Sequence, residues 1–456
     1  MRIREDENGQ MLVMTALSLL LLIGFLALAI DVGVLFRAQR NMQIAADAGA
    51  IAAALNYAYS TSPNPTSAAD SAAAANGVTN ANYVTVNNPA VNGYHTGAGF
   101  IEVIVSEPNP TYFMSLFGIN PVNVAARAVA GTIPNPSCIY VLDPTDSSTL
   151  QLQGSYQVNT PNCGVLVDSS SSSAICITGS SSAGYFNAPY IRVFGAQGSA
   201  GNCKGSITGT TIQNGVSPIQ DPFANMTEPP LTACNSANTV TAATVTSATT
   251  IPASSYLPVT GGSTVALTCF ANPNPLQPVT LSNVTLGSTS TTTTNGVTNT
   301  VGSNSIFLFE NGVTISGSVT VGGTLDNYQG TLSQGNNVLN VYAPAGTSLP
   351  YNGIGIMQPN TNTTGTCSPS VGEPAPCLQL QFGASGGTSS GGYGNLNGLI
   401  YAPTSTVYLQ DGGGGVVTTG IISYKLVIGP SGLNITNSYN SANPSTTPLK
   451  TVAMVE

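Results

Sequence analysis

The side chains that could catalyse hydrolysis are few and widely separated. Asp143 and Asp146 lie in one short DPTD segment, and Asp411 directly precedes the glycines 412–415. Glycoside hydrolysis needs two carboxylates that flank the scissile bond. A DPTD segment is more typical of a turn in which an aspartate accepts backbone N–H groups, and Asp411 lies in a glycine-rich bend. His95, the one histidine, lies in a loop sequence without an evident partner. We therefore predict no catalytic residues.

A serine-rich segment beginning at Asp168 is the candidate metal site. Asp168-Ser169-Ser170-Ser171-Ser172 satisfies the D-x-S-x-S pattern that holds a metal ion in von Willebrand factor A domains. In that fold the motif leads into an amphipathic helix, whereas the apolar run 174–177 predicts another strand here. The chain has no C-x-x-C pair, and one histidine cannot complete the common zinc sites. We expect a serine-rich turn, and neither a metal ion nor a cofactor in this protein.

The cysteines predict disulfide chemistry. The chain contains eight cysteines, an even number, and all of them follow the first apolar segment. Such usage is typical of an oxidising compartment outside the cytoplasm. Their spacing does not fix the full connectivity. We expect Cys367 to pair with Cys377, which closes a short Pro/Gly loop, and Cys138 to pair with Cys163.

Composition restricts the classes of partner. Charged residues make up 6% of the 456 residues, against roughly a quarter in typical soluble domains. Four of the nine basic residues lie in the first 40 positions and the other five are scattered. Binding to nucleic acid needs clustered Lys and Arg that displace counterions from phosphates, so we exclude it. An apolar content of 42% is too high for a disordered chain.

One membrane-spanning element precedes all of these residues. Met11 to Ile30 is an uncharged run of twenty mostly apolar residues, which at about 1.5 Å per residue crosses a hydrocarbon core of about 30 Å. The numbers of Lys and Arg on the two sides of this segment are equal, so they do not determine its orientation. The downstream cysteines favour the orientation with the short tail in the cytoplasm. A cleaved signal peptide is an alternative interpretation of this segment, because Ala27-Leu28-Ala29 fits a cleavage site. A type IV prepilin is a further alternative, although the fifth residue after Gly9 is Met14 rather than glutamate.

The helical pattern continues beyond the span to about residue 59, before the Ser62–Pro65 segment that ends it. Short apolar runs then predict a small α+β domain. Its expected elements are a helix over 66–76, strands over 83–86, 100–105 and 122–130, and a helical turn over 110–117.

The stretch from residue 7 to residue 54 resembles the N-terminal segment of TadE/TadG-like proteins of the Flp (Tad) pilus-assembly system. The matching positions of this stretch are Gly9, Gln10, Gly24, Ala29-Ile30-Asp31-Val32-Gly33, Arg40, Gln43 and Ala46-Asp47-Ala48. The resemblance implies a membrane helix with a stalk, a small α+β domain packed on it, and partners among the other Tad/Flp assembly proteins. A plain membrane anchor with a helical stalk is the simpler alternative.

From Cys138 onward the sequence pattern changes to short runs of β-branched residues separated by Gly, Ser, Asn or Thr. Few charges and few Asn-Gly hairpin turns favour a parallel β-helix over a sandwich. Pro218–Phe223 and Gly398–Pro403 are similar to segments of TadG-related proteins with a β-helical C-terminal region. The expected organisation is multidomain: an anchor and stalk (1–60), a small α+β domain (61–131), a linker (132–137), a β-helix-like ectodomain (138–440) and a tail (441–456).

These features predict a non-enzymatic protein of the bacterial inner membrane that takes part in Flp/Tad pilus assembly, with its C-terminal domains in the periplasm or outside the cell. Two alternatives remain from other classes. One is a membrane-tethered carbohydrate-active β-helix enzyme, which would need a cleft with two carboxylates. The other is a surface adhesin whose ectodomain contacts glycans or surfaces.

Overall fold

In the computed structural model the chain forms two compact units. Unit 1 contains residues 1–133 and 450–456, and unit 2 contains residues 134–449. The structure describes residues 8–59, 63–97, 99–134, 137–154, 156–161, 163–178, 184–199, 201–203, 205–207, 209–224, 226–257, 264–294, 297–335, 337–345, 351–359, 377–380, 383–384, 394–409, 413–414, 420–429, 432–434 and 450–456.

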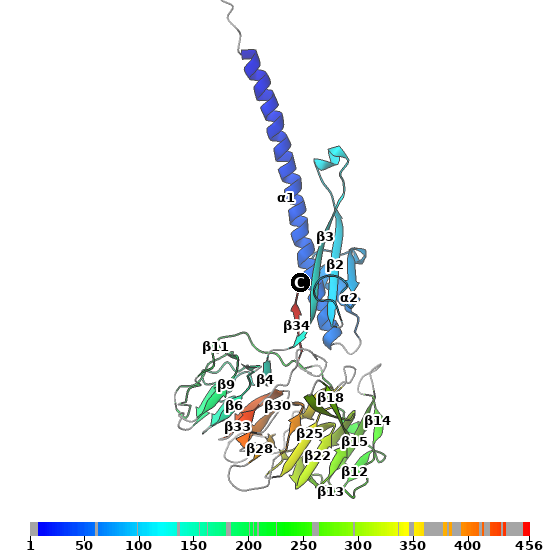
Figure 1. Cartoon of the computed structure of the whole chain (residues 1–456), viewed down its shortest axis with the longest axis vertical. Helices are drawn as coiled ribbons and strands as arrows, with labels where there is room; N and C mark the ends of the chain where they lie inside the picture. The colour runs from blue at the N-terminus through cyan, green and yellow to red at the C-terminus, as the bar shows by residue number, and fades with distance from the viewer. Residues whose placement is uncertain are drawn as a thin grey trace, which may run out of the picture. The chain divides into compact units, whose positions relative to one another are not determined.

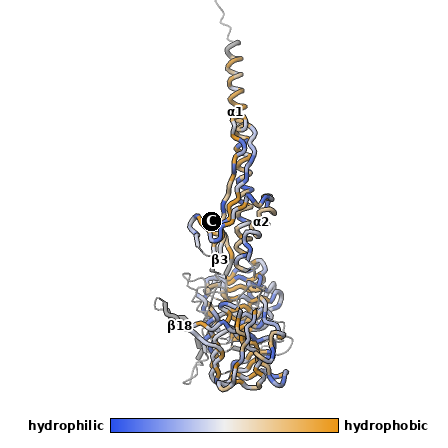
Figure 2. The backbone as a smooth tube through the Cα atoms, turned by 90° about the vertical axis from the view of Figure 1, so that its right-hand side faces the viewer, coloured by the Kyte–Doolittle hydropathy of each residue, from blue (hydrophilic) through white to orange (hydrophobic). Residues whose placement is uncertain are grey.

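Unit 1 begins with one long helix, α1 (Asn8–Tyr59), of 52 residues, or about 78 Å at the standard rise. Its N-terminal part contains the Met11–Ile30 segment, in which the large apolar side chains are exposed, Leu12 at 72% and Leu22 at 66%. These residues are orange in the upper part of Figure 2. Within the described residues this is the helix that is long and apolar enough to cross a membrane. The predicted long apolar helix is thus confirmed.

The C-terminal half of α1 packs through small side chains. Ala45, Ala46, Ala50 and Ala53 are fully buried in a cluster shared with helix α2 (Pro65–Ala75) and strand β2 (Phe100–Asn109). A Cβ added at Gly49 would lie 3.2 Å from Val103 of β2. Alanine and glycine therefore let the helix approach its neighbours closely, which larger residues on this face would prevent.

The sheet of unit 1 has the order β1-β2-β3-β34. Strands β1 (Val84–Asn87) and β3 (Val122–Pro134) pair antiparallel with β2, and η1 (Ala81–Tyr83) leads into β1. Strand β34 (Lys450–Met454) completes the sheet beside β3. Figure 1 shows the β2–β3 hairpin running alongside α1.

Two expected boundaries differ from the structure. Residues 132–134 of the expected linker continue β3, and β4 already begins at Ser137. Residues 450–454 of the expected tail form β34, because Val452 and Met454 pack into the apolar cluster of unit 1. The chain thus leaves the sheet of unit 1 through β3, forms all of unit 2, and returns through β34. Unit 2 is an insertion between two neighbouring strands.

Unit 2 consists mainly of parallel strands stacked in three columns. The first column contains, in stacking order, β12 (Thr239–Thr241), β15 (Val265–Ala271), β20 (Ser305–Phe309), β23 (Thr324–Asn327), β26 (Ile354–Met357), β30 (Leu399–Leu409), β32 (Gly420–Ile428), β4 (Ser137–Val141), β7 (Gly164–Val167), β10 (Ile191–Val193) and β11 (Ile212–Asn214).

The other two columns follow the same order. The second contains β13 (Thr244–Thr246), β16 (Val279–Ser282), β21 (Val313–Ser316), β24 (Leu332–Ser333), β27 (Cys377–Leu380), the second halves of β30 and β32, β5 (Leu150–Gln153) and β8 (Ile175–Thr178). The third contains β17 (Thr285–Gly287), β22 (Ser318–Gly322), β25 (Val338–Tyr342) and β29 (Leu396–Asn397), and separately β33 (Gly432–Asn434), β6 (Gln157–Asn159) and β9 (Tyr185–Asn187).

The remaining described strands of unit 2 pair antiparallel. They are β14 (Ser254–Tyr256) with β15, β18 (Thr289–Thr294) with β19 (Val297–Gly302), and β28 (Gly383–Ala384) with β31 (Gly413–Gly414). The expectation of a mainly-β region after the long helix is confirmed.

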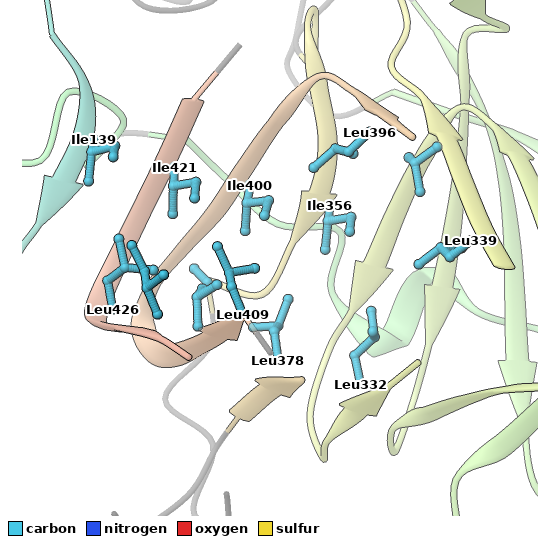
Figure 3. Packing of buried hydrophobic residues seen from close by; sticks show 14 of the residues in the cluster. Ile139, Leu332, Leu339, Ile356, Leu378, Leu396, Ile400, Leu409, Ile421 and Leu426 are labelled. Atoms are coloured by element: carbon cyan, nitrogen blue, oxygen red, sulfur yellow. The ribbon is translucent and has the colours of Figure 1, made fainter. Parts of the chain in front are cut away.

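The core of unit 2 lies between the columns. Ile139, Ile421, Ile400 and Ile356 stand in register on four adjacent strands of the first column, and Figure 3 shows them as one row. All four are at most 1% exposed, and each contributes roughly 1.5–3 kcal/mol by burial. Identical side chains thus stack from strand to strand, which fixes the parallel register.

The stacking order of unit 2 is not its chain order. From β4 the chain winds outward to β11, then crosses to β12 at the opposite end of the first column and winds back to β32, which pairs with β4. The first and last strands of this path are therefore neighbours, as an insertion into unit 1 requires. The crossing is made by residues 216–234, here called the strap, which is described except at residue 225.

Candidate functional site

The position of Asp31, directly after the membrane segment, is the most specific feature of unit 1. Its side chain is fully buried although the apolar residues around it are exposed. The carboxylate accepts three backbone N–H groups, from Tyr112 at 2.8 Å, Phe113 at 2.9 Å and Met114 at 2.6 Å. Charge-assisted bonds of this kind are among the stronger protein hydrogen bonds. Asp31 thus holds the hairpin tip, residues 110–121 between β2 and β3, against α1.

The hairpin tip is closed by its own hydrogen bonds. The Thr111 hydroxyl donates to the Ile119 carbonyl at 2.5 Å, and the Thr111 N–H donates to the Asn120 side chain at 3.2 Å. Between them lies the short helix η2 (Met114–Phe117), which ends at Gly118 with a φ of +79°. Only glycine adopts this left-handed conformation without strain. The N–H groups that donate to Asp31 belong to the residues at the start of η2. Their orientation is therefore fixed by the loop itself.

A second contact between α1 and the sheet involves two of the family-motif residues. The Gln43 amide donates to Asp47 at 2.6 Å and to the backbone carbonyl of Arg127 in β3 at 3.2 Å. Gly33 and Arg40 have no such role among the described residues: Arg40 is exposed, and a Cβ added at Gly33 would meet nothing within 4 Å. Gly9 and Gln10 lie in the first turns of α1.

A buried ion network lies on the other face of the sheet. The Arg127 guanidinium donates to two carboxylates, those of Glu102 and Glu456. Glu102 is fully buried, and the Glu456 carboxylate lies 2.7 Å from the guanidinium. Glu456 also accepts the backbone N–H groups of Tyr94 at 2.5 Å and His95 at 2.9 Å. The network therefore ties residues 450–456 to β2, β3 and the 88–97 loop. It accounts for His95, whose ring contacts Glu456 at 3.2 Å.

The pKa values of these carboxyl groups follow from their donors. Burial alone would raise the pKa of Glu102, but Arg127 and the amide groups of Asn87, Val91 and Asn92 outweigh it and lower this pKa. Arg127 and the backbone N–H of His95 lower the pKa of Glu456 to about 2. Both groups are therefore ionised at neutral pH, and the network is structural rather than proton-transferring.

The candidate catalytic and metal positions of unit 2 have structural partners. Asp143 accepts the N–H groups of Thr145 and Asp146 in a turn, and Asp146 contacts Lys425 at 2.9 Å. Asp168 accepts the N–H of Ile219 at 2.5 Å and so fixes the start of the strap. Asp411 lies outside the described residues.

The strap covers an apolar row on the outer face of the first column. Strap side chains of Ile219, Phe223, Met226 and Leu231 pack against outward-facing residues of the stacked strands, among them Leu308, Met357 and Tyr401. The Tyr401 hydroxyl donates to Asp221 at 2.8 Å and to the Phe223 carbonyl at 3.0 Å. At its far end, Cys234 forms a disulfide with Cys269 of β15.

A carboxyl pair that the sequence did not indicate lies beneath the strap. Asp326 of β23 stands in the outward row between Leu308 and Met357 and is fully buried. Burial and the neighbouring Glu228 of the strap raise the pKa of Asp326 well above its ordinary value. Burial likewise raises the pKa of Glu228 to about 7. Two like charges cannot share such a site, so the pair holds a proton at neutral pH.

Among the described residues, the disulfides are Cys138–Cys163, Cys176–Cys203 and Cys234–Cys269. The first is one of the two pairs expected from the sequence. The other, Cys367 with Cys377, lies outside the described residues at Cys367. Disulfides are typical of proteins outside the cytoplasm.

Among the described residues, the long apolar helix indicates one membrane anchor, and the disulfides fit an extracytoplasmic region. Residues 9–56 match the family model for Flp pilus-assembly TadE/G-like proteins, which confirms the resemblance stated above for this segment. The match covers nearly all of α1, including Asp31, Gln43 and Asp47. Comparison with curated proteins and with solved structures found no match.

Proposed function

We propose that the chain is a non-enzymatic inner-membrane protein that takes part in the assembly of Flp/Tad pili. Its short N-terminal tail lies in the cytoplasm, and unit 2 and the part of unit 1 that follows the membrane span lie in the periplasm or outside the cell. The observation that carries the proposal is the TadE/G-like match over residues 9–56. The matched residues form the helix that spans the membrane. This helix binds the hairpin tip through Asp31 and contacts β3 through Gln43.

In this proposal unit 2 is a parallel β-helix whose coils follow a permuted order. The three columns of parallel strands, with in-register apolar stacks between them, support this assignment. The strap then joins what would be the two ends of an ordinary β-helix. An ectodomain of this kind presents its outward-facing residues to partners, which are other Tad/Flp assembly proteins and, in the adhesin alternative, glycans or surfaces.

The carbohydrate-active alternative depends on the Glu228–Asp326 pair, since paired carboxylates are what glycoside hydrolysis needs. Asp326 is fully buried beneath the strap, whereas a catalytic carboxyl group must reach the glycosidic oxygen of its substrate. A stabilising role for the pair is therefore favoured over turnover.

Deletion of the gene in its host, followed by electron microscopy of the cell surface, tests the proposed function. We expect Flp pili to be lost or mislocalised and restored by the wild-type chain. Restoration by Glu228→Gln and by Asp326→Asn is expected as well, because neither residue acts in catalysis. Normal pili in the deletion strain would contradict the pilus role, and a folded Glu228→Gln variant that fails to restore them would favour the enzyme alternative.

Carbonate extraction of membranes tests the localisation. An apolar span of this length should keep the protein in the pellet at alkaline pH. Release of the intact protein, or a mature N-terminus at Ile30, would contradict the anchor and favour the cleaved signal peptide.

A further inference from the structure

The hairpin tip exposes several large apolar side chains close together in the sequence. Within ten residues, Tyr112 is 62% exposed, Leu116 80%, Phe117 83% and Ile119 47%. Solvent-exposed hydrophobic residues scattered singly are ordinary, but a contiguous group of this kind marks an interaction site.

The tip is also free of charge. From Pro108 to Val122 the sequence has no Asp, Glu, Lys or Arg, and the nearest charged residues are Glu107 and Arg127. Protein-binding surfaces of soluble domains usually carry a polar rim around an apolar centre. An uncharged apolar loop with a tyrosine at its base is instead typical of segments that lie in the interface of a bilayer.

The Asp31 carboxylate sets the depth of the tip relative to the membrane. Asp31 directly follows the Met11–Ile30 span, and its hydrogen bonds to Tyr112, Phe113 and Met114 hold η2 beside this end of the span. The two neighbours of Asp31 in α1 are also apolar and exposed, Ile30 at 44% and Val32 at 39%. The exposed apolar side chains of the tip therefore lie at the same end of the span as exposed apolar residues of the helix.

From this geometry we infer that the hairpin tip is a second membrane contact, which inserts Leu116 and Phe117 into the extracytoplasmic leaflet beside α1. The occupant of the apolar surface is the bilayer interface, to a depth of about 5–10 Å. Asp31 satisfies the backbone N–H groups that would otherwise enter this region unpaired, as a low-dielectric environment requires. The inference rests on the membrane anchor and is independent of the pilus role.

The chain contains no tryptophan, so a single introduced indole reports the environment of the tip without background. We would reconstitute full-length Phe117→Trp into phosphatidylcholine/phosphatidylglycerol vesicles, with and without lipids brominated near the headgroup. Tyr94→Trp is the matched control, because Tyr94 is 97% exposed and precedes the start of β2, at the end of the hairpin away from the tip. Phe117 is itself largely exposed, so its replacement does not disturb the core.

We expect Phe117→Trp to emit at shorter wavelength than Tyr94→Trp and to lose most of its fluorescence with brominated lipids, while Tyr94→Trp is quenched by aqueous acrylamide only. Leu116→Trp repeats the measurement at a second exposed position. Acrylamide quenching of Phe117→Trp equal to that of the control would overturn the inference. Short-wavelength emission that brominated lipids leave unchanged would also overturn it, in favour of a protein partner. Failure of the protein to float with vesicles would instead contradict the anchor itself.

Discussion

The carboxylate of Asp31 accepts the backbone N–H of Met114 at 2.6 Å across 83 positions of sequence. This hydrogen bond, with those from Tyr112 and Phe113, joins the end of the membrane segment to the tip of a hairpin. It gives a residue of the TadE/G-like segment a structural partner outside the matched residues 9–56.

Replacement of Asp31 by leucine should free the hairpin tip. Three buried N–H groups lose their acceptor, at a cost of about 1–3 kcal/mol for each group that stays unsatisfied. We expect the amides of residues 112–114 to exchange with deuterium at least about tenfold faster in detergent, since 1.4 kcal/mol corresponds to tenfold. Pilus assembly should weaken while the protein still accumulates. Asp31→Asn, which keeps one acceptor oxygen, should show a smaller effect, and unchanged exchange in Asp31→Leu would contradict the assignment.

The ion network of unit 1 predicts a non-additive pair of substitutions. Arg127→Leu leaves the buried Glu102 without its counter-charge, which typically costs about 3–5 kcal/mol. The double variant Arg127→Leu/Glu102→Leu should recover much of that loss, because the fully buried charge is removed and Glu456 keeps the N–H groups of Tyr94 and His95. The difference in the free energy of unfolding is measured by denaturant unfolding, in which proteolytic cleavage within residues 84–130 reports the unfolding of unit 1. Equal destabilisation of the single and double variants would show that Arg127 acts by packing alone.

The carboxyl pair beneath the strap predicts a pH dependence of stability. Because the pKa of Glu228 is raised from 4.5 to about 7, the native state binds more protons than the unfolded state between these values. The contribution of the pair to the free energy of unfolding should therefore be fully present below pH 4.5 and fall as pH rises to 7, by roughly 1–3 kcal/mol. Thermal unfolding of the full chain in detergent across this range provides the measurement.

Asp326→Asn should flatten that dependence and stabilise unit 2 above pH 7, because it removes a fully buried carboxyl group whose own pKa is raised well above its ordinary value. Asp146→Asn is the matched control. Lys425 lowers the pKa of Asp146, so its contribution is lost as pH falls below the ordinary aspartate range and does not alter the slope between pH 4.5 and 7. A wild-type stability that rises with pH across this window would contradict the proton held by the pair.

Peptide mapping without reduction should recover the linked pairs 138–163, 176–203 and 234–269. The two cysteines outside these pairs, Cys367 and Cys377, should be linked to each other as the sequence predicts. Cys234→Ser should cost about 2–4 kcal/mol and loosen the strap, since this disulfide closes a loop that contains β12–β14. Free thiols at positions 367 and 377 in protein taken from the cell envelope would contradict the fourth pair.

Local elements were predictable from the sequence because local patterns determine them. The helical run across residues 8–59 and the alternating strands around Ile101 and Ala128 have the periods that burial on one face requires. Strand β34 was missed because a five-residue run after a Ser- and Pro-rich stretch carries no local signal, and Val452 and Met454 become apolar contacts only through β3.

Long-range pairings were not predictable for a physical reason. Ile139 stacks on Ile421 although 282 positions separate them, and no periodicity in either segment specifies this neighbour. The same holds for Glu228 and Asp326, which come from a strap and a strand, and for Asp31, whose place at the end of the apolar run was evident but whose hydrogen-bond donors lie 81 to 83 positions away.

The insertion of unit 2 between β3 and β34 sets the order in which the protein can be made. A polypeptide crossing the membrane from its N-terminal anchor delivers β1, β2 and β3 first, and β34 only after residue 449 has emerged. Domains fold as units as they become available, so the sheet of unit 1 stays incomplete while the entire inserted unit is exported. A chain truncated or stalled within unit 2 lacks both Glu456 and the last strand of unit 1. Completion of the sheet of unit 1 therefore requires that all of unit 2 has already been synthesised.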